Sequence, residues 1–302
     1  MATINTNMSA NVAANSLTRN ERSMAATMER LSTGIRINSA KDDAAGLAIT
    51  SKMTSQINGL NQAVRNANDA ISMIQVGEGA LKEVTNMLQR MRELAIQASS
   101  DSNTDADRTA LNNEFTQLRD EISRIAANTQ WNGTAIFAHT AAVSDKVFQV
   151  GSNASQTITV SFKNFDAGTT TNTANNSGDA TANSSFAALD VDGGSNTKNI
   201  ENLAITSRTG SNEAMFAMSA AIDAVNSQRA LLGASMSRLE FASDNLQNVA
   251  QNSAAARSRV LDADYAAETT ELARTQIIQQ AATAMLAQAN ASKQNILSLL
   301  QQ

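Results

Sequence analysis

The chain has 302 residues, of which 42% are hydrophobic, and its formal net charge is −5 at pH 7. This charge gives no reason to expect a polyanionic partner, and no basic run interleaved with aromatic residues occurs, so nucleic-acid binding is not expected. There is no cysteine, which excludes disulfides and thiolate metal sites. There is also no proline, and aromatic residues make up only 3%. We therefore expect an aliphatic core and long, uninterrupted helices.

The N-terminus lacks a basic stretch followed by an apolar one, so no general secretory signal is expected. No apolar run is long enough to span a membrane, and membrane insertion is not expected. If the protein leaves the cell, another exporter must carry it.

Both ends of the chain carry apolar residues at helical spacing. Near the C-terminus they recur at alternating steps of four and three from Ile278 onward, and a second apolar row runs beside the first. This spacing is typical of helices that pack against other helices, whereas chain ends are normally polar. We therefore predict that both ends are assembly surfaces. The predicted assembly seam consists of Leu17, Met24, Met28, Leu31, Ile35, Ile278, Met285, Ile296 and Leu299.

The helical pattern of the N-terminal end breaks at Gly34, after which Ser39 and Asp42 have the spacing of a capping box for the next helix. Asp42 and Asp43 could instead be a carboxylate pair for a metal or for acid–base chemistry. At a helix start, however, such residues more often cap the helix and complement its dipole, and we favour that interpretation.

A long apolar seam predicts one continuous helix over residues 45–98, about 80 Å long at the usual rise per residue. The Gly-Glu-Gly at 77–79 suggests a phosphate loop only weakly, because the third glycine of the motif is missing and no strand precedes it. Thr104 and Asp107 predict a second capping box and a helix that folds back on the first. The Asn-Gly at 132–133 predicts a turn.

Alternating residues at 147–150 and 158–162 predict a β-hairpin. Residues 164–199 are rich in Thr, Asn, Ser, Gly and Asp, which predicts an exposed insert without a large core. His139 is the single histidine, so an HExxH zinc site cannot form. A serine triad would have to include His139, and no Gly-x-Ser-x-Gly elbow is present. We therefore expect no enzyme activity, catalytic residue, metal or cofactor. A second long helix is predicted from about residue 212 to 260.

These elements predict a mainly α fold, in which long antiparallel helices from both chain ends form a coiled-coil-like bundle with a small β-hairpin insert. The expected domains are a terminal helical coiled-coil core (1–44 and 262–302), a helical rod domain with the hairpin (45–163 and 200–261) and a short exposed insert (164–199).

Several long motifs occur in a fixed order at the two ends. They are LSTGIRINSAKDDAAG at 31–46, RNANDAIS at 65–72, LQRMRELA at 88–95, SRV with DYA at 258–266, QQA at 279–281, LAQAN at 286–290 and QNILSLL at 294–300. Together they resemble the N-terminal and C-terminal signatures of bacterial flagellin, over residues 1–163 and 200–302.

This resemblance implies the structural subunit of the flagellar filament, used for swimming motility, with its two termini in a coiled coil at the filament core and its outer domains reduced. It also implies unfolded export through a type III apparatus, an extracellular location and polymerisation at the filament tip. The implied partners are further copies of itself, an export chaperone on the C-terminal helix, and hook-junction and cap proteins. A hook-junction or tip protein stays open as an alternative function.

The resemblance further implies recognition by the flagellin-sensing Toll-like receptor. Alternatively, the same surface contacts a neighbouring subunit in the filament. The residues that match the receptor epitope are Gln89, Arg90, Leu94, Gln97 and Glu114.

Overall fold

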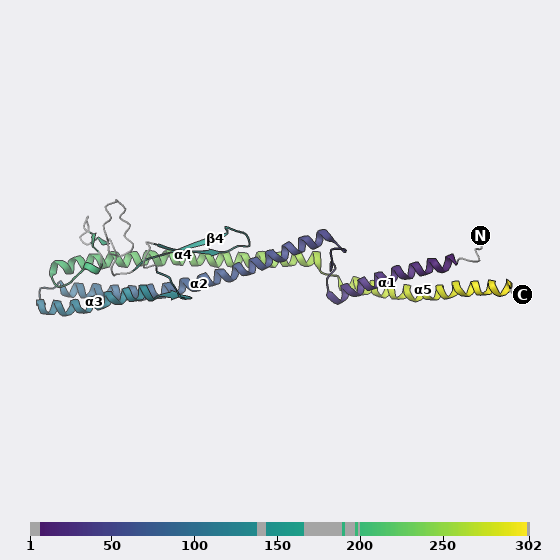
Figure 1. Ribbon diagram of the computed structural model, residues 1–302. Helices are drawn as coiled ribbons and strands as arrows, with labels where there is room; N and C mark the ends of the chain where they lie inside the picture. Colours follow the sequence, from purple (N-terminus) through teal and green to yellow (C-terminus); the bar gives the residue numbers. More distant parts are fainter. Residues whose placement is uncertain (1–6, 138–142, 166–188, 191–196, 199, 301–302) are drawn as a thin grey trace. The chain divides into compact units, whose positions relative to one another are not determined.

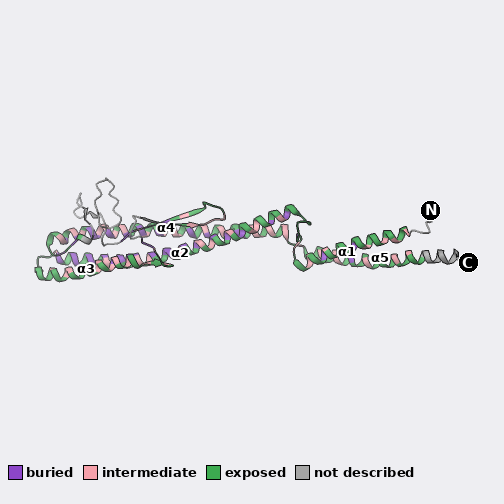
Figure 2. Ribbon diagram, in the orientation of Figure 1, coloured by how far each residue is buried: buried purple, intermediate pink, exposed green. Residues whose placement is uncertain are grey.

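The computed structural model describes residues 7–137, 143–165, 189–190, 197–198 and 200–300. Most of the predicted insert, together with His139, lies outside these residues. The chain divides into two compact units, one built from residues 1–57 and 250–302 and the other from residues 58–249. Figure 1 shows the long helices, and Figure 2 shows how far each residue is buried.

The described residues are mostly helical, which confirms the predicted mainly α fold. The helices are α1 (Met8–Thr33), α2 (Ala44–Ala98), α3 (Asp105–Asn128), α4 (Arg208–Leu261) and α5 (Tyr265–Leu300), with a short 3₁₀ turn at Ile200–Asn202. The strands form antiparallel pairs: β1 (Gln130–Trp131) with β2 (Thr134–Ala135), β3 (Val143–Gln149) with β4 (Thr157–Lys163), and β5 (Leu189–Asp190) with β6 (Thr197–Lys198).

Two breaks between helices meet in the first unit. Helix α1 ends at Thr33 and is capped by Gly34, whose φ of 71° is the left-handed conformation that glycine adopts at helix ends. The following residue, Ile35, forms an isolated antiparallel bridge with Asp262, in the break between α4 and α5. The Arg36 backbone N–H donates to the Leu261 carbonyl at 2.6 Å, and the Ala263 N–H donates to the Gly34 carbonyl at 3.0 Å. The bridge therefore ties the end of α1 to the start of α5.

The start of α2 differs in detail from the prediction. Asp42 accepts from the Ser39 backbone N–H at 2.9 Å and from its hydroxyl at 3.0 Å, but this turn lies before the helix. Asp43 is the residue that caps α2, since its Oδ1 accepts from the Gly46 N–H at 2.9 Å. The predicted cap, Ser39, thus lies four residues before the residue that caps the helix. The hydrogen bonds from Ser39 lower the pKa of Asp42.

The second unit packs α2, α3 and α4 around a mostly aliphatic core that also contains buried phenylalanines (Figure 1). Leu81 and Leu88 of α2, Phe115 of α3, and Met218 and Val225 of α4 are all fully buried. Helix α3 begins with the predicted capping box, in which the Asp107 N–H donates to the Thr104 hydroxyl and the Thr104 N–H donates back to the Asp107 carboxylate. The Thr104 hydroxyl also donates to the Asp107 carboxylate at 2.6 Å, and this bond, together with the one from the Thr104 N–H, lowers the pKa of Asp107.

The Asn-Gly pair forms the predicted turn between β1 and β2. Asn132 and Gly133 have φ angles of 49° and 75°, as the two central residues of a tight hairpin turn require. The Gly-Glu-Gly sequence, which suggested a phosphate loop only weakly, lies inside α2, as the prediction of a continuous helix required.

The larger hairpin pairs β3 with β4 and confirms the predicted one, in a register that places Val147 opposite Thr159. Phe162 is fully buried and packs edge-on against Phe137, with ring centroids 6.2 Å apart. A Cβ at Gly77 would lie 3.2 Å from Phe162 Cε1, so the glycine lets α2 approach the ring closely. The hairpin is therefore part of the core of this unit.

Candidate assembly surface

Helices α1 and α5 run side by side in the first unit (Figure 1). A row of buried and partly buried side chains on each helix recurs at alternating steps of three and four, as in a coiled coil. On α1 the row is Ala10, Ala13, Leu17, Asn20, Met24, Thr27 and Leu31, and on α5 it is Glu268, Leu272, Thr275, Gln279, Ala282, Leu286 and Ala289.

Some of the predicted seam residues lie in the contact between α1 and α5, and others are exposed. Leu17, Met24 and Leu31 lie on the contact line of α1, whereas Met28 is exposed. Ile35 is partly buried in the bridge that follows the helix.

On α5 the contact line is shifted by one residue from the predicted seam. Gln279 and Leu286 share it, while Ile278 and Met285 are exposed. Sequence spacing could not distinguish these rows, because both repeat at the same period. Ile296 and Leu299 belong to α5, but their side chains lie outside the described part of the structure.

The contact between α1 and α5 has a polar interior. The Asn20 side-chain amide donates to the Thr275 carbonyl at 2.7 Å, and Asn20, Thr27 and Thr275 are all buried. A buried amide between coiled helices selects one register and lowers the stability of the pair. Arg30 and Glu268 form a cross-helix ion pair at 3.4 Å. The two helices are therefore held in one register by these polar contacts.

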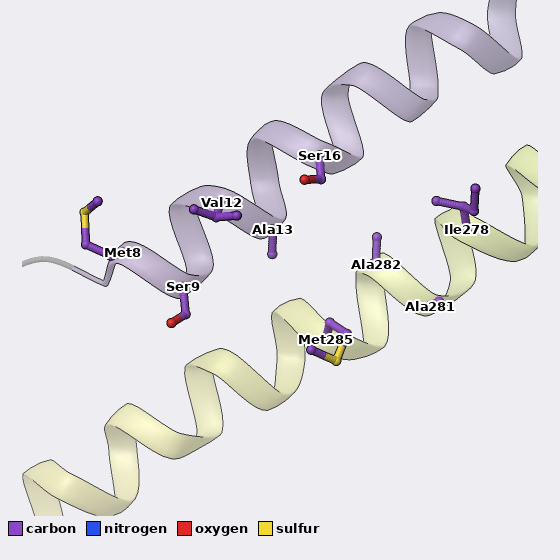
Figure 3. Close-up of a pocket in the computed structure, with 9 residues that line it drawn as sticks. All are labelled: Met8, Ser9, Val12, Ala13, Ser16, Ile278, Ala281, Ala282 and Met285. Carbon is purple, nitrogen blue, oxygen red and sulfur yellow. The ribbon is translucent and has the colours of Figure 1, made fainter.

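Other apolar side chains are exposed on the outside of these helices. Met8 and Val12 are each 61% exposed and Met285 is 65% exposed. Together with Ile278 they border an open groove of about 610 Å³ between α1 and α5 (Figure 3). The remaining lining residues are small: Ser9, Ala13, Ser16, Ala281 and Ala282. No lining residue carries a charge, so the groove suits an apolar occupant.

Further apolar side chains are exposed elsewhere in the same unit. They are Met28, Ile49, Tyr265 and Ile277. Exposed apolar residues in such numbers, on helices that already have a partner, are typical of a protein–protein interaction surface. The described helices include none that is both long enough and apolar enough to cross a membrane.

The residues of the expected receptor surface gather on α2 and α3 in the second unit. Gln89, Arg90, Gln97 and Glu114 are exposed, whereas Leu94 is fully buried in the core. Arg90 forms ion pairs with Glu114 at 2.9 Å and with Glu93 at 3.1 Å. The hydrogen bond to Glu114 raises the pKa of Arg90. Leu94 thus packs in the core beneath this surface.

No group of acidic, His or Cys side chains that could hold a metal ion occurs within the described ranges. Sequence reasoning missed Asn20 and Thr275, because a polar residue in an apolar repeat reads as an interruption until its partner is known. The 255 residues that separate Asn20 from Thr275 give no local signal of that contact.

Two family models match the chain. Residues 4–142 match the bacterial flagellin N-terminal helical region, and residues 215–300 match the bacterial flagellin C-terminal helical region. A flagellin of Halalkalibacterium halodurans is 43% identical over 273 residues, covering 90% of each chain. The chain belongs to the bacterial flagellin family.

Another flagellin, from Bacillus subtilis, is 41% identical over 308 residues and covers 98% of this chain and 99% of its own. Among solved structures, a putative flagellar hook-associated protein from Vibrio parahaemolyticus is similar in fold, with a TM-score of 0.54 and 16% identity. The structural alignment covers 73% of this chain and 100% of the solved chain. Membership of the flagellin family makes the chain a structural protein of the flagellar filament.

Proposed function

We propose that the chain self-assembles, through its two terminal helices, into the helical filament of the bacterial flagellum. The observation that carries this proposal is the uncharged groove between α1 and α5, bordered by exposed Met8, Val12, Ile278 and Met285. Repeated contacts between different surfaces of identical subunits generate helical filaments. The groove supports such a contact because its apolar rim lacks a partner within the described part of the chain.

The same proposal includes unfolded export through a type III apparatus, addition of subunits at the tip of an extracellular filament, and a role in swimming. It places the terminal coiled-coil core at residues 1–44 and 262–302, the rod domain at 45–163 and 200–261, and the exposed insert at 164–199. The proposed partners are further copies of the chain, hook-junction and cap proteins, and an export chaperone on the C-terminal helix. Resemblance to the family supports these partners.

Seeded growth tests the proposal. Purified full-length protein, added to short filament seeds and followed by light scattering and electron microscopy, is expected to extend the seeds into long helical filaments. A truncation that removes residues 262–302 is expected to give no growth and to lose the chaperone in co-purification, because it lacks α5. A full-length chain that only caps the seeds would instead indicate a junction or tip protein.

We also propose that the exposed surface around Arg90 is recognised by the flagellin-sensing Toll-like receptor. Soluble monomer is expected to activate reporter cells, and Arg90→Ala is expected to lower the response by about tenfold, as loss of a charge-assisted contact does. Glu121→Ala on α3 is a matched control, since it also removes one partner of an exposed ion pair, the one with Arg124. Absence of a response to the unaltered monomer would contradict the proposal.

A further inference from the structure

The β3–β4 hairpin is a two-stranded sheet whose outer edges pair with no further strand in the described part of the chain. An open edge presents unpaired backbone N–H and C=O groups to which another strand can add. Strand β4 has the sequence TITVSFK, with β-branched residues and neither proline nor glycine. Such a segment has a high tendency to pair with copies of itself. The hairpin therefore requires some means of keeping its edges closed.

Pairing geometry identifies the backbone groups that point outward. The Val150 N–H donates to the Gln156 carbonyl at 2.9 Å next to the turn. In an antiparallel ladder, hydrogen-bonded and non-hydrogen-bonded pairs alternate. Counting from this bond, the pairs Gln149–Thr157 and Asp145–Ser161 are non-hydrogen-bonded. The carbonyls of Gln149 and Ser161 consequently point away from the partner strand, one at each edge of the hairpin.

A side-chain amide from a helix binds each of these two carbonyls. The Asn66 Nδ2 of α2 donates to the Gln149 carbonyl at 3.0 Å, at the edge of β3. The Gln228 Nε2 of α4 donates to the Ser161 carbonyl at 2.7 Å, at the edge of β4. Helix α2 thus binds the edge of β3 and helix α4 binds the edge of β4. Each binds a carbonyl to which an added strand would hydrogen-bond.

Burial of the Gln228 side chain carries a free-energy cost. The residue is fully buried, and its Oε1 has no hydrogen-bond partner among the described residues. An apolar side chain would avoid burying that unpaired acceptor. The Gln228 amide therefore contributes the hydrogen bond to the Ser161 carbonyl, which an apolar residue could not form.

Helix α2 also approaches the loop that joins the two strands closely. A Cβ at Gly59 would lie 3.1 Å from the Ser152 Cβ and 3.3 Å from the Ser152 Cα. The helix therefore lies directly against the loop of the hairpin, seven residues before Asn66 in the sequence.

We propose that Asn66 and Gln228 close the two edges of the β3–β4 hairpin against a further β-strand, the excluded partner being the same hairpin of a second copy of this chain. The hairpin is then a latent interaction surface, which becomes available when either amide is lost. This inference does not depend on the proposed function, since it concerns contacts inside one unit.

The test uses full-length protein carrying Gln228→Leu, alone and with Asn66→Leu. Hydrogen exchange of the amides of residues 157–163 is expected to become about tenfold faster in Gln228→Leu, because a buried hydrogen bond to the strand is lost. The double variant is expected to form assemblies that bind thioflavin T and show the infrared band of intermolecular β-structure. Gln247→Leu is the matched control, since Gln247 is an exposed amide on α4, and it is expected to do neither.

A rescue variant separates edge pairing from general aggregation. Thr159 is exposed and paired with Val147 at a non-hydrogen-bonded position, so its N–H points outward. Thr159→Pro removes that outward donor without removing a bond of the ladder, and adding it to the double variant is expected to suppress the β-rich assemblies.

Three results would overturn the proposal. They are unchanged exchange in Gln228→Leu, faster exchange without β-rich assembly in the double variant, and assembly that persists with Thr159→Pro. Seeded filament growth, measured on the same samples by electron microscopy, reports separately on the proposed function.

Discussion

Replacing both Ile278 and Met285 with glutamate is expected to slow filament elongation by at least about a hundredfold at neutral pH. Both side chains border the uncharged groove between α1 and α5, and the proposed assembly would bury them against another subunit. Leaving an unpaired charge in a buried contact costs on the order of 3–5 kcal/mol, which exceeds the roughly 2.8 kcal/mol that a hundredfold change requires. The growth of short seeds, followed by light scattering, measures the effect.

A matched variant tests whether the groove itself is responsible. Gln276 and Gln280 are exposed residues of the same helix, and their positions at 100° per residue place them on the face opposite Ile278. Gln276→Glu with Gln280→Glu adds the same charge to α5 and is expected to change elongation much less. Equal loss of growth in the two double variants would show that the added charge, and not the groove, is the cause.

Phe162→Ala is expected to lower the free energy of unfolding by about 3–5 kcal/mol, the usual cost of truncating a buried phenylalanine to alanine. The ring is fully buried, contacts Phe137 and is approached by α2 at Gly77. Its removal leaves a cavity where the hairpin joins the helices, so the hairpin is also expected to lose protection from hydrogen exchange. Urea unfolding followed by circular dichroism measures the change.

Phe241 provides the control for that substitution. Its side chain is 75% exposed on α4, and Phe241→Ala is expected to change the unfolding free energy by no more than about 0.5 kcal/mol. A similar loss of stability in the two variants would mean that burial of Phe162 does not contribute as the structure indicates.

Local sequence determined where several elements begin or end. The cap of α3 by Thr104 and Asp107, the end of α1 at Gly34 and the turn at Asn132 each depend on the conformational preferences of a few adjacent residues. The spacing of hydrophobic residues along the sequence then distinguished the long helices from the β3–β4 hairpin. These features could be predicted because their physical causes lie within one or two turns of chain.

Only the tertiary structure decided which faces are covered. Leu94 and Ile278 both belong to apolar rows of helices, yet the first is buried and the second exposed. On α5 two rows repeat at the same period, and the one that contains Gln279 and Leu286 faces α1. The sequence by itself therefore determined the helices, the hairpin and the flagellin resemblance. The partners of Asn20, Asn66 and Gln228 lie 255, 83 and 67 residues away, so their roles came from the tertiary structure, because a hydrogen bond between distant residues leaves no local pattern.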